Sequence, residues 1–274
     1  MLSIIICSRK SDISDELKQN IADTVGCDYE LVVIDNSTNK YSIFSAYNEG
    51  VNRSKGELLC FCHDDIVFHT HAWGGVIEYI LLNNNYLGGV GVLGGHLLPK
   101  QESYYLLSSG NILQQQKDGT VEKELRNDHF DENGLDEMAA LDGLFMVIPK
   151  RLFVEKSLMF DESYGGFHMY DLDISMQIRE AGYKLVVTDR ILVEHRTDIT
   201  GVLEGAAFRK ELHKFYGKWE SSFPVIVGVS DAYLSEKYTE LYYKLESIHF
   251  SHAYKLGSML MKPVKSLKRV IRKL

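Results

Sequence analysis

Short apolar runs that each stop at polar residues, and that alternate with helix-like segments, are the feature that most constrains the fold of this chain. Three such runs lie near the start, at residues 2–7, 30–34 and 58–62. Segments 12–25 and 42–54 separate them, and segment 12–25 has its apolar residues four apart, the spacing of an amphipathic helix. Alternating buried strands and helices are typical of βαβ units around a parallel sheet. The sequence therefore predicts an α/β fold.

The alternation resumes after an interruption in the middle of the chain. Residues 96–135 are polar and rich in Gln, Ser and Tyr, with turn signals at 109–111 and 117–119, and they predict a hairpin-bearing insertion. The remaining segments predict further helices and strands. The expected helices are 71–83 and 171–181, and the expected strands are 90–93, 144–148, 184–187 and 191–193.

Charge is spread unevenly along the chain. The formal net charge of −8 argues against a nucleic-acid partner, because binding through bulk charge needs a basic face. After Glu246 every charged residue is basic, and residues 262–274 place apolar and basic residues at helical spacing. We therefore expect a domain over 1–230 and a helical C-terminal extension over 231–274. Its basic amphipathic tail would lie on a membrane surface, contact a protein or remain a solvated helix.

Polar side chains follow the first three apolar runs directly. Ser8, Asp35 and the triplet His63–Asp64–Asp65 stand at the expected carboxyl ends of strands. Ligands of parallel α/β sheets bind outside those ends. Carboxylates and imidazole can hold Mg²⁺ or Mn²⁺ against a diphosphate. The alternative is an ordinary strand-to-helix turn capped by one of the aspartates.

Two further groups of polar residues carry possible chemistry. Asp171 and Asp173 open the expected helix at 171–181, where a carboxylate can act as a general base at an open rim. The alternative is capping, with Asp171 as the N-cap. His195 follows the last expected strand and could bind a metal or hydrogen-bond within the core.

Taken together, these segments resemble the family-2-type glycosyltransferases of the GT-A fold. The resemblance runs from Ser3 to His195 and is strongest over residues 160–183. It is carried by ELVVIDNS, AYNEGVNRSKGELLCFCHDDIVF, LDGLFMVIPKRLF, FDESYGGFHMYDLDISMQIREAGYKLVV and ILVEHR. It implies a Rossmann-like nucleotide-diphospho-sugar transferase domain with a mostly parallel sheet flanked by helices.

The resemblance also implies a donor site. Ser8 and Asp35 match positions that hold the base and ribose of the nucleotide, and Asn48 lies in the helix that faces it. The triplet His63, Asp64 and Asp65 matches the Asp-x-Asp motif that binds metal and diphosphate. We expect Mn²⁺ or Mg²⁺ as the cofactor and a nucleotide-diphosphate sugar as the co-substrate.

The acceptor side follows from the same resemblance. Asp171 matches the catalytic base, and Asp142–Gly143 matches the segment beside the donor sugar and the acceptor. Tyr170 and Asp173 flank the base and are expected to bind sugar or acceptor as well. His195 matches a histidine that joins the metal shell in several relatives.

Two positions depart from the usual motifs. His63 replaces the first Asp of Asp-x-Asp, and Tyr170 replaces the Glu before the base, a combination similar to a bacterial subgroup of these enzymes. The expected metal ligands are therefore Asp65, His63 and His195. An alternative register makes Asp64 the principal ligand.

The function implied is transfer of a hexosyl group, with inversion, to a hydroxyl of a cell-surface glycan or lipid-linked oligosaccharide. A non-catalytic nucleotide- or carbohydrate-binding relative is the first alternative, and a sugar nucleotidyltransferase is the second. No signal peptide and no bilayer-length apolar run is visible, which predicts a cytoplasmic protein, peripheral at the inner face of the membrane if the tail binds lipid.

Overall fold

The computed structural model describes most of the chain. The described residues are 1–100, 102–116, 118–125, 130–197 and 205–230. Residues Met1–Gly228 form one compact unit. The predicted extension 231–274, including its basic tail 262–274, lies outside the described residues, so its helical character stays a prediction.

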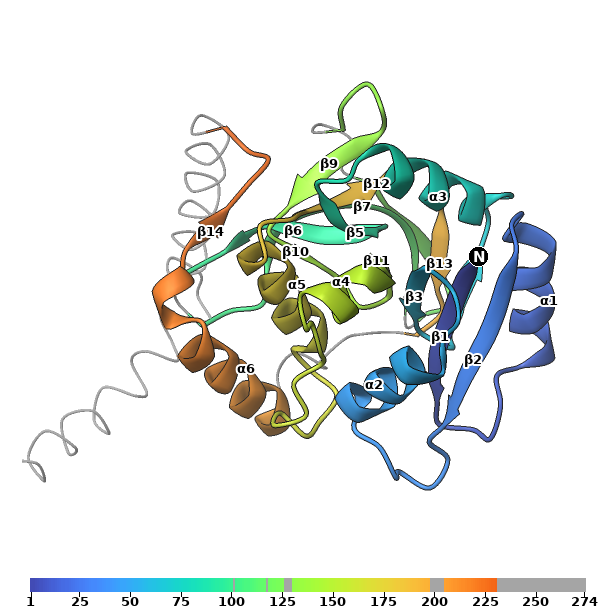
Figure 1. Cartoon of the computed structure of the whole chain (residues 1–274), viewed down its shortest axis with the longest axis horizontal. Helices are drawn as coiled ribbons and strands as arrows, with labels where there is room; N and C mark the ends of the chain where they lie inside the picture. The colour runs from blue at the N-terminus through green and yellow to red at the C-terminus, as the bar shows by residue number, and fades with distance from the viewer. Residues whose placement is uncertain (101, 117, 126–129, 198–204, 231–274) are drawn as a thin grey trace, which may run out of the picture. The chain divides into compact units, whose positions relative to one another are not determined.

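The larger sheet contains the three early apolar runs and four later described strands. In the described structure its order is β2-β1-β3-β11-β5-β12-β9. The strands are β2 (Tyr29–Asp35), β1 (Leu2–Ser8), β3 (Leu58–Cys62), β11 (Phe145–Pro149), β5 (Leu87–Gly91), β12 (Lys184–Thr188) and β9 (Leu135–Met138). β1 is parallel to β2 and β3, and β12 is parallel to β5, whereas β11 and β9 run in the opposite direction. The predicted mixed sheet is confirmed (Figure 1); five of its seven described strands run in one direction, but three of its six pairings are antiparallel, so it is less parallel than predicted.

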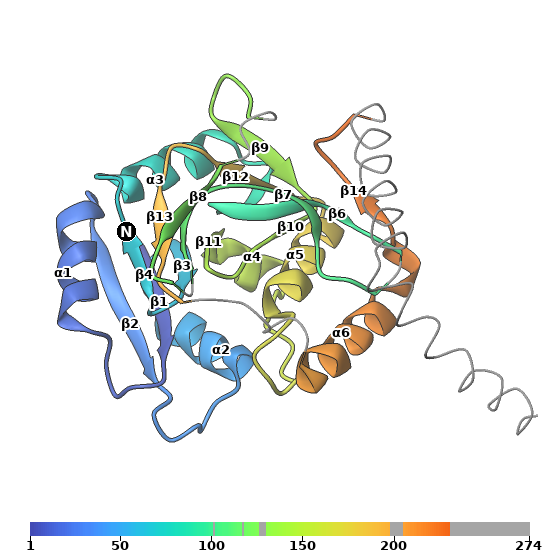
Figure 2. The same cartoon turned by 180° about the vertical axis from the view of Figure 1, so that it is seen from behind.

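A second sheet pairs the strand that ends at His195 with the strand that begins directly after Asp65. Its order is β10-β6-β7-β13-β4, with β14 paired to β6 and β8 paired to β7 (Figure 2). The strands are β10 (Ala140–Leu141), β6 (Leu93–Leu98), β7 (Leu106–Gln115), β13 (Val193–His195), β4 (Ile66–Phe68), β14 (Val225–Ile226) and β8 (Val121–Leu125). β13 joins β4 antiparallel, pairing His195 with Ile66.

Helices cover both faces of the larger sheet. They are α1 (Asp15–Thr24), α2 (Ile43–Arg53), α3 (Trp73–Asn83), α4 (Lys150–Glu155), α5 (Tyr170–Glu180) and α6 (Ala206–Lys218), with a 3-10 turn at Glu220–Ser222. Alternation along β1 divides the core. Ile4 and Ile6 pack with α1 and α3, and Ile5 packs with α2, α4, α5 and α6. Side chains of a strand point to opposite faces, so a short apolar run fills both cores.

The segment 96–135 is a hairpin-bearing insertion in part. The expected turn at 117–119 is correct for its described residues 118 and 119, because the Gly119 amide donates to the Gln116 carbonyl where β7 is joined to β8. The expected turn at 109–111 is wrong, because these residues lie inside β7. Gly110 is needed there for close approach, since a Cβ would collide with the Val92 carbonyl oxygen.

Among the described helices, none combines the length and the apolar composition required to cross a bilayer.

Candidate active site

Four of the predicted site segments meet at one edge of the larger sheet. Parallel pairing sets Ser8, at the end of β1, beside Asp35, at the end of β2. β3 runs in the same direction, so the triplet that follows Cys62 emerges at this edge too. β11 runs the other way and begins there, with Phe145 paired to Cys62, which places Asp142–Leu144 at the same edge. The topology therefore assembles these segments independently of their distance in sequence.

Ser8 and Asp64 tie two strand ends together. The Ser8 hydroxyl donates a 2.7 Å hydrogen bond to Oδ2 of Asp64. Ser8 is buried, whereas Asp35 is exposed and accepts a hydrogen bond from the Ser37 amide. That amide, together with the Ser37 side chain, lowers the pKa of Asp35. One Asp64 oxygen is thus committed to Ser8, which favours Asp65 over Asp64 as the principal metal ligand.

His63, Asp65 and His195 form a compact cluster of potential metal ligands. Nδ1 of His63 lies 3.7 Å from Oδ1 of Asp65, and Nε2 of His195 lies 3.5 Å from Oδ2. One ligand atom from each residue falls within 4.8 Å of the others. Nδ1 of His195 is hydrogen-bonded to Oε1 of Gln114 at 3.0 Å, which fixes the ring and leaves Nε2 facing Asp65.

The cluster has the chemistry of a divalent-cation site. Oδ1 of Asp65 is buried and has no hydrogen-bond partner among the described residues. Burial opposes ionisation of Asp65, but hydrogen bonds from His195 and Thr197 lower its pKa well below the usual range. Desolvation lowers the pKa of His63, although Asp65 opposes this, so the ring favours its neutral form. An anionic carboxylate between two imidazoles is a donor set that fits Mn²⁺.

Tyr170 connects this cluster to the helix that carries Asp171. Its hydroxyl is hydrogen-bonded to Nε2 of His63 at 2.9 Å. The same hydroxyl lies against Gly143, where an added Cβ would collide with it. The departure from the usual Glu thus places a phenol, which is bulky and uncharged, next to both the His63–Asp65–His195 cluster and the segment that binds Asp171. Gly143 is required by this close approach.

Asp171 is a buried carboxylate at the first turn of α5. Met169 precedes the helix in the left-handed region, with φ 64°, so Met169 and not Asp171 is the N-cap. The Asp171 side chain accepts hydrogen bonds from the amides of Leu172 and Gly143 and from the Tyr104 hydroxyl. It is 4% exposed.

Burial and a neighbouring charge tune this carboxylate. Desolvation, followed by the nearby Asp142, raises the pKa of Asp171 to about 7, although its three hydrogen bonds oppose the rise. Asp142 itself accepts hydrogen bonds from the Tyr105 hydroxyl at 2.8 Å and from the Leu144 amide at 2.9 Å. A group that titrates near neutral pH is well suited to general-base catalysis.

Two predicted site residues use their polar groups inside the protein. Asn48 binds the backbone of Phe160 through both its oxygen and its nitrogen and also donates to Glu162. Asp173 is 1% exposed and accepts hydrogen bonds from Trp219 and Lys218, together with others. Both residues hold loops and helices together, so we leave them out of the proposed substrate contacts.

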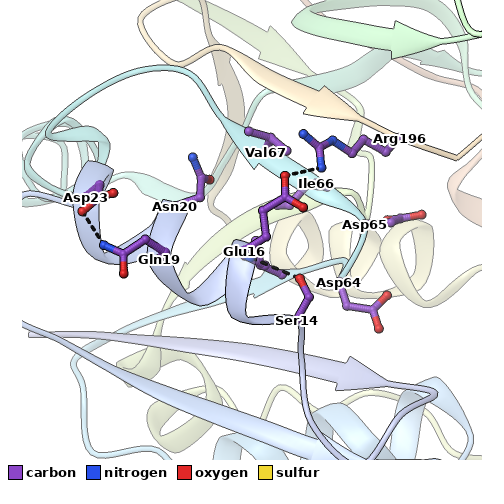
Figure 3. Close-up of a pocket in the computed structure, with 11 residues that line it drawn as sticks. Ser14, Glu16, Gln19, Asn20, Asp23, Asp64, Asp65, Ile66, Val67 and Arg196 are labelled. Carbon is purple, nitrogen blue, oxygen red and sulfur yellow. Dashed lines mark hydrogen bonds and ion pairs between the residues drawn. The ribbon is translucent and has the colours of Figure 1, made fainter.

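A cavity of about 390 Å³ lies between α1 and β4 and reaches the metal cluster (Figure 3). Asp64 and Asp65 line it from the loop after β3, and α1 supplies much of the opposite wall. An ion pair joins Glu16 to Arg196 across it, with 2.8 Å between carboxylate and guanidinium.

Two residues in contact with the site escaped the sequence analysis. Tyr104 donates to Asp171, and Gln114 holds His195. Both lie in the polar segment 96–135, which has no periodicity to single out a position. The adjacent tyrosines Tyr104 and Tyr105 in an otherwise polar stretch are the one signal that could have indicated the first contact.

Comparisons with known proteins place this geometry in context. The model of a family described as "Glycosyltransferase like family" matches residues 3–204. GalNAc-T7, solved with UDP, GalNAc and Mn²⁺, superposes with a TM-score of 0.56 at 13% identity over 80% of this chain and 48% of that one. S. aureus TarS 1–349 gives a TM-score of 0.51 at 12% identity over 79% and 64%. This chain thus spans about half of the first structure and under two thirds of the second. No curated protein matches it.

Proposed function

Because the chain belongs to the glycosyltransferase-like family and has the GT-A fold, we propose that it moves a hexosyl group from a nucleotide-diphosphate donor to an acceptor hydroxyl. One observation carries the proposal. Asp171, a buried carboxylate with a pKa of about 7, lies at the same sheet edge as the His63–Asp65–His195 cluster. Tyr170, the residue before Asp171, is hydrogen-bonded to His63 and so couples base and cluster.

Asp171 acts as the general base in this proposal. It accepts the proton of the acceptor hydroxyl as that oxygen attacks the anomeric carbon, on the face opposite the departing nucleoside diphosphate, so the reaction inverts the configuration. The two backbone amides that bind Asp171 orient the carboxylate during the transfer. Asp142, Gly143 and Tyr170 border the base and are the proposed sugar and acceptor contacts.

The donor occupies the carboxyl ends of β1, β2 and β3. Asp35 is the proposed nucleotide side-chain contact, and Asp64, which is held by the buried Ser8 hydroxyl, borders the diphosphate. His63, Asp65 and His195 would hold Mn²⁺ or Mg²⁺. When bound, the cation stabilises negative charge on the departing diphosphate. The UDP and Mn²⁺ of GalNAc-T7 support this choice of donor class and metal, and the H-x-D and Y-D-x-D motifs make this chain a variant of the usual pattern.

The proposed acceptor is a cell-surface glycan or a lipid-linked oligosaccharide. A lipid-linked acceptor would suit a cytoplasmic enzyme that is peripheral to the membrane through residues 262–274, whose basic and apolar residues alternate at helical spacing. Co-sedimentation with anionic vesicles should fall when residues 262–274 are removed. Equal co-sedimentation of both proteins would exclude the tail as the anchor.

The variant Asp171→Asn tests the proposed function directly. We expect transfer to fall by about 10²–10⁴-fold, the usual contribution of a general base. Binding of the nucleotide diphosphate, measured by calorimetry with Mn²⁺, should remain near the wild-type value. Asp118→Asn, in the exposed turn between β7 and β8, is the matched control and should transfer normally.

The alternatives give different results in the same assays. A non-catalytic binding relative would bind the nucleotide but neither transfer sugar nor hydrolyse the donor. A nucleotidyltransferase would release diphosphate from a nucleoside triphosphate instead of releasing a nucleoside diphosphate. Full turnover by Asp171→Asn would exclude Asp171 as the base.

A further inference from the structure

The hydroxyl of Tyr104 lies on the carboxylate of Asp171. It donates a short hydrogen bond to Oδ2, the same oxygen that accepts a 3.1 Å hydrogen bond from the Gly143 amide. The other oxygen, Oδ1, accepts from the Leu172 amide at 2.9 Å. Of the three donors, only Tyr104 is a side chain that can leave without disturbing the backbone.

This arrangement closes Oδ2 to any further partner. A carboxylate oxygen has about two acceptor positions, and both on Oδ2 are taken. Asp171 is 4% exposed, so solvent does not provide a second approach to it. An acceptor hydroxyl that uses Oδ2 must therefore take the position that Tyr104 now holds.

The segment that carries Tyr104 packs on both α6 and the second sheet, where the Tyr105 ring lies against Gly95 of β6. The Tyr104 ring contacts that of Phe208, with centroids 6.1 Å apart, and that of Tyr105, with centroids 4.6 Å apart. The Tyr216 hydroxyl donates to the backbone carbonyls of Pro99 and Ser103. The Tyr104 phenol therefore reaches Asp171 from a different segment than the amides of Gly143 and Leu172, so its displacement would leave those two hydrogen bonds to the carboxylate in place.

We propose that the Tyr104 hydroxyl occupies the acceptor-hydroxyl position on Oδ2 of Asp171 and keeps water from using that oxygen until an acceptor displaces it. The proposal rests on the proposed function. Tyr104 is a positioning residue in this scheme, because it acts through Asp171. The aromatic wall of Tyr104, Tyr105 and Phe208 would then border the acceptor.

The reaction that Tyr104 suppresses is hydrolysis of the donor. A water oxygen would form the new bond to the anomeric carbon, and the bond from that carbon to the diphosphate oxygen would break. One water proton would pass to Oδ2 of Asp171, and the nucleoside diphosphate would leave with the electron pair of the broken bond. No oxidant or reductant is required.

The variant Tyr104→Phe removes the hydroxyl and keeps the ring. The first measurement needs no activity. With ¹³C-labelled aspartate, the carboxyl resonance of Asp171 is assigned by its loss in Asp171→Asn and titrated in wild type and variant. Because the Tyr104 hydrogen bond lowers the pKa of Asp171, we expect a higher pKa in Tyr104→Phe. An unchanged pKa would show that the hydroxyl does not bind Asp171 and would overturn the proposal.

The second measurement is release of nucleoside diphosphate from a panel of nucleotide-diphosphate sugars with Mn²⁺ and no acceptor. Rates are compared on the high-pH plateau, where Asp171 is ionised in both proteins. We expect hydrolysis by Tyr104→Phe to exceed wild type by about fivefold, the ratio that one ordinary hydrogen bond corresponds to. Tyr183→Phe is the matched control. It removes a phenol hydroxyl that accepts from Arg151 just before β12 begins, and its hydrolysis rate should equal that of wild type.

The outcomes separate the two proposals. If wild type hydrolyses a donor and Tyr104→Phe does so no faster, the role of Tyr104 is refuted and the proposed function stands. If neither protein consumes any donor while the titration still detects the Tyr104 hydrogen bond, both the proposed function and the role of Tyr104 in it are refuted.

Discussion

The His195 imidazole of the candidate metal site is oriented by Gln114, a residue outside the proposed substrate contacts. Oε1 of Gln114 accepts a hydrogen bond from Nδ1 of His195, and Nε2 of Gln114 donates a 2.8 Å hydrogen bond to the Thr197 carbonyl. We predict that Gln114→Ala weakens Mn²⁺ binding by about 10–100-fold, because the freed ring no longer presents Nε2 toward Asp65. Calorimetric titration with Mn²⁺ measures the change.

The control for that prediction lies two residues along the same hairpin. Gln116 is bonded to Glu122 at the surface, and Gln116→Ala should bind Mn²⁺ like wild type. Equal affinities for both variants would mean that His195 is either held by other contacts or is not a ligand.

Gly143 is the residue at which the site is most tightly packed. An alanine methyl there would collide with the Tyr170 hydroxyl, which must then release His63. We predict that Gly143→Ala lowers the free energy of unfolding by about 1–3 kcal/mol, as overpacked cores do, and lowers transfer as well. Urea denaturation measures the first effect. Gly75→Ala, in α3 with open space around it, should instead stabilise by about 0.5–1 kcal/mol.

Individual site residues differed in how far the sequence could predict them. Residues at strand ends, such as Asp65 and Asp35, follow from the pattern of apolar runs, because the ends of parallel strands share an edge. The contacts of Tyr104 and Gln114 depend on how a polar segment folds back over the sheet. No local periodicity encodes that path, so a single sequence could not reveal these contacts.

At the scale of the elements, a buried carboxylate of α5 binds the C-terminal end of α6. Asp173 on α5 accepts a hydrogen bond from Trp219 at 2.9 Å and pairs with Lys218 at 2.8 Å. We predict that Asp173→Ala costs about 2–3 kcal/mol of unfolding free energy, because a buried indole N–H and a partly buried ammonium lose their partner. Asp173→Asn keeps an acceptor oxygen and should cost less.

The binding assays distinguish this role from the one expected from the sequence. Under the anchoring role, both Asp173 variants should bind nucleotide and Mn²⁺ with unchanged affinity. A specific rise in acceptor KM, with normal stability, would restore Asp173 to the acceptor site and contradict the anchoring role.

Elements with a strong apolar pattern were predictable, and those made by tertiary contact were not. β1, β2 and β3 coincide with the apolar runs, and α5 ends before Gly182, whose φ of +87° suits the residue after a helix. Gly110 predicted a turn but lies in β7, because glycine also serves where two backbones approach closely. The three-residue strand β4 owes its pairing to β13, far along the chain.

At the scale of the whole molecule, the proposed base should cost stability at neutral pH. The pKa of Asp171 is about 7 in the folded protein and 3.8 without the fold. Between these values the folded state keeps a proton that the unfolded chain has lost. The contribution of Asp171 to the free energy of unfolding is therefore largest at low pH and declines as the pH rises toward 7. Under the proposed function, the form of Asp171 that accepts the proton is the ionised one, whereas the folded site favours the protonated one.

Comparing wild type with Asp171→Asn isolates this contribution. Between pH 5 and pH 8, with metal chelated, the unfolding free energy of wild type should decline by an amount on the order of 2 kcal/mol more than that of the variant. The other titrating groups are shared and cancel in the difference. Urea denaturation at both pH values measures it. Parallel declines would mean that Asp171 titrates near its ordinary pKa in the folded protein, and the acid limb of the transfer rate would then fall near pH 4 instead of near pH 7.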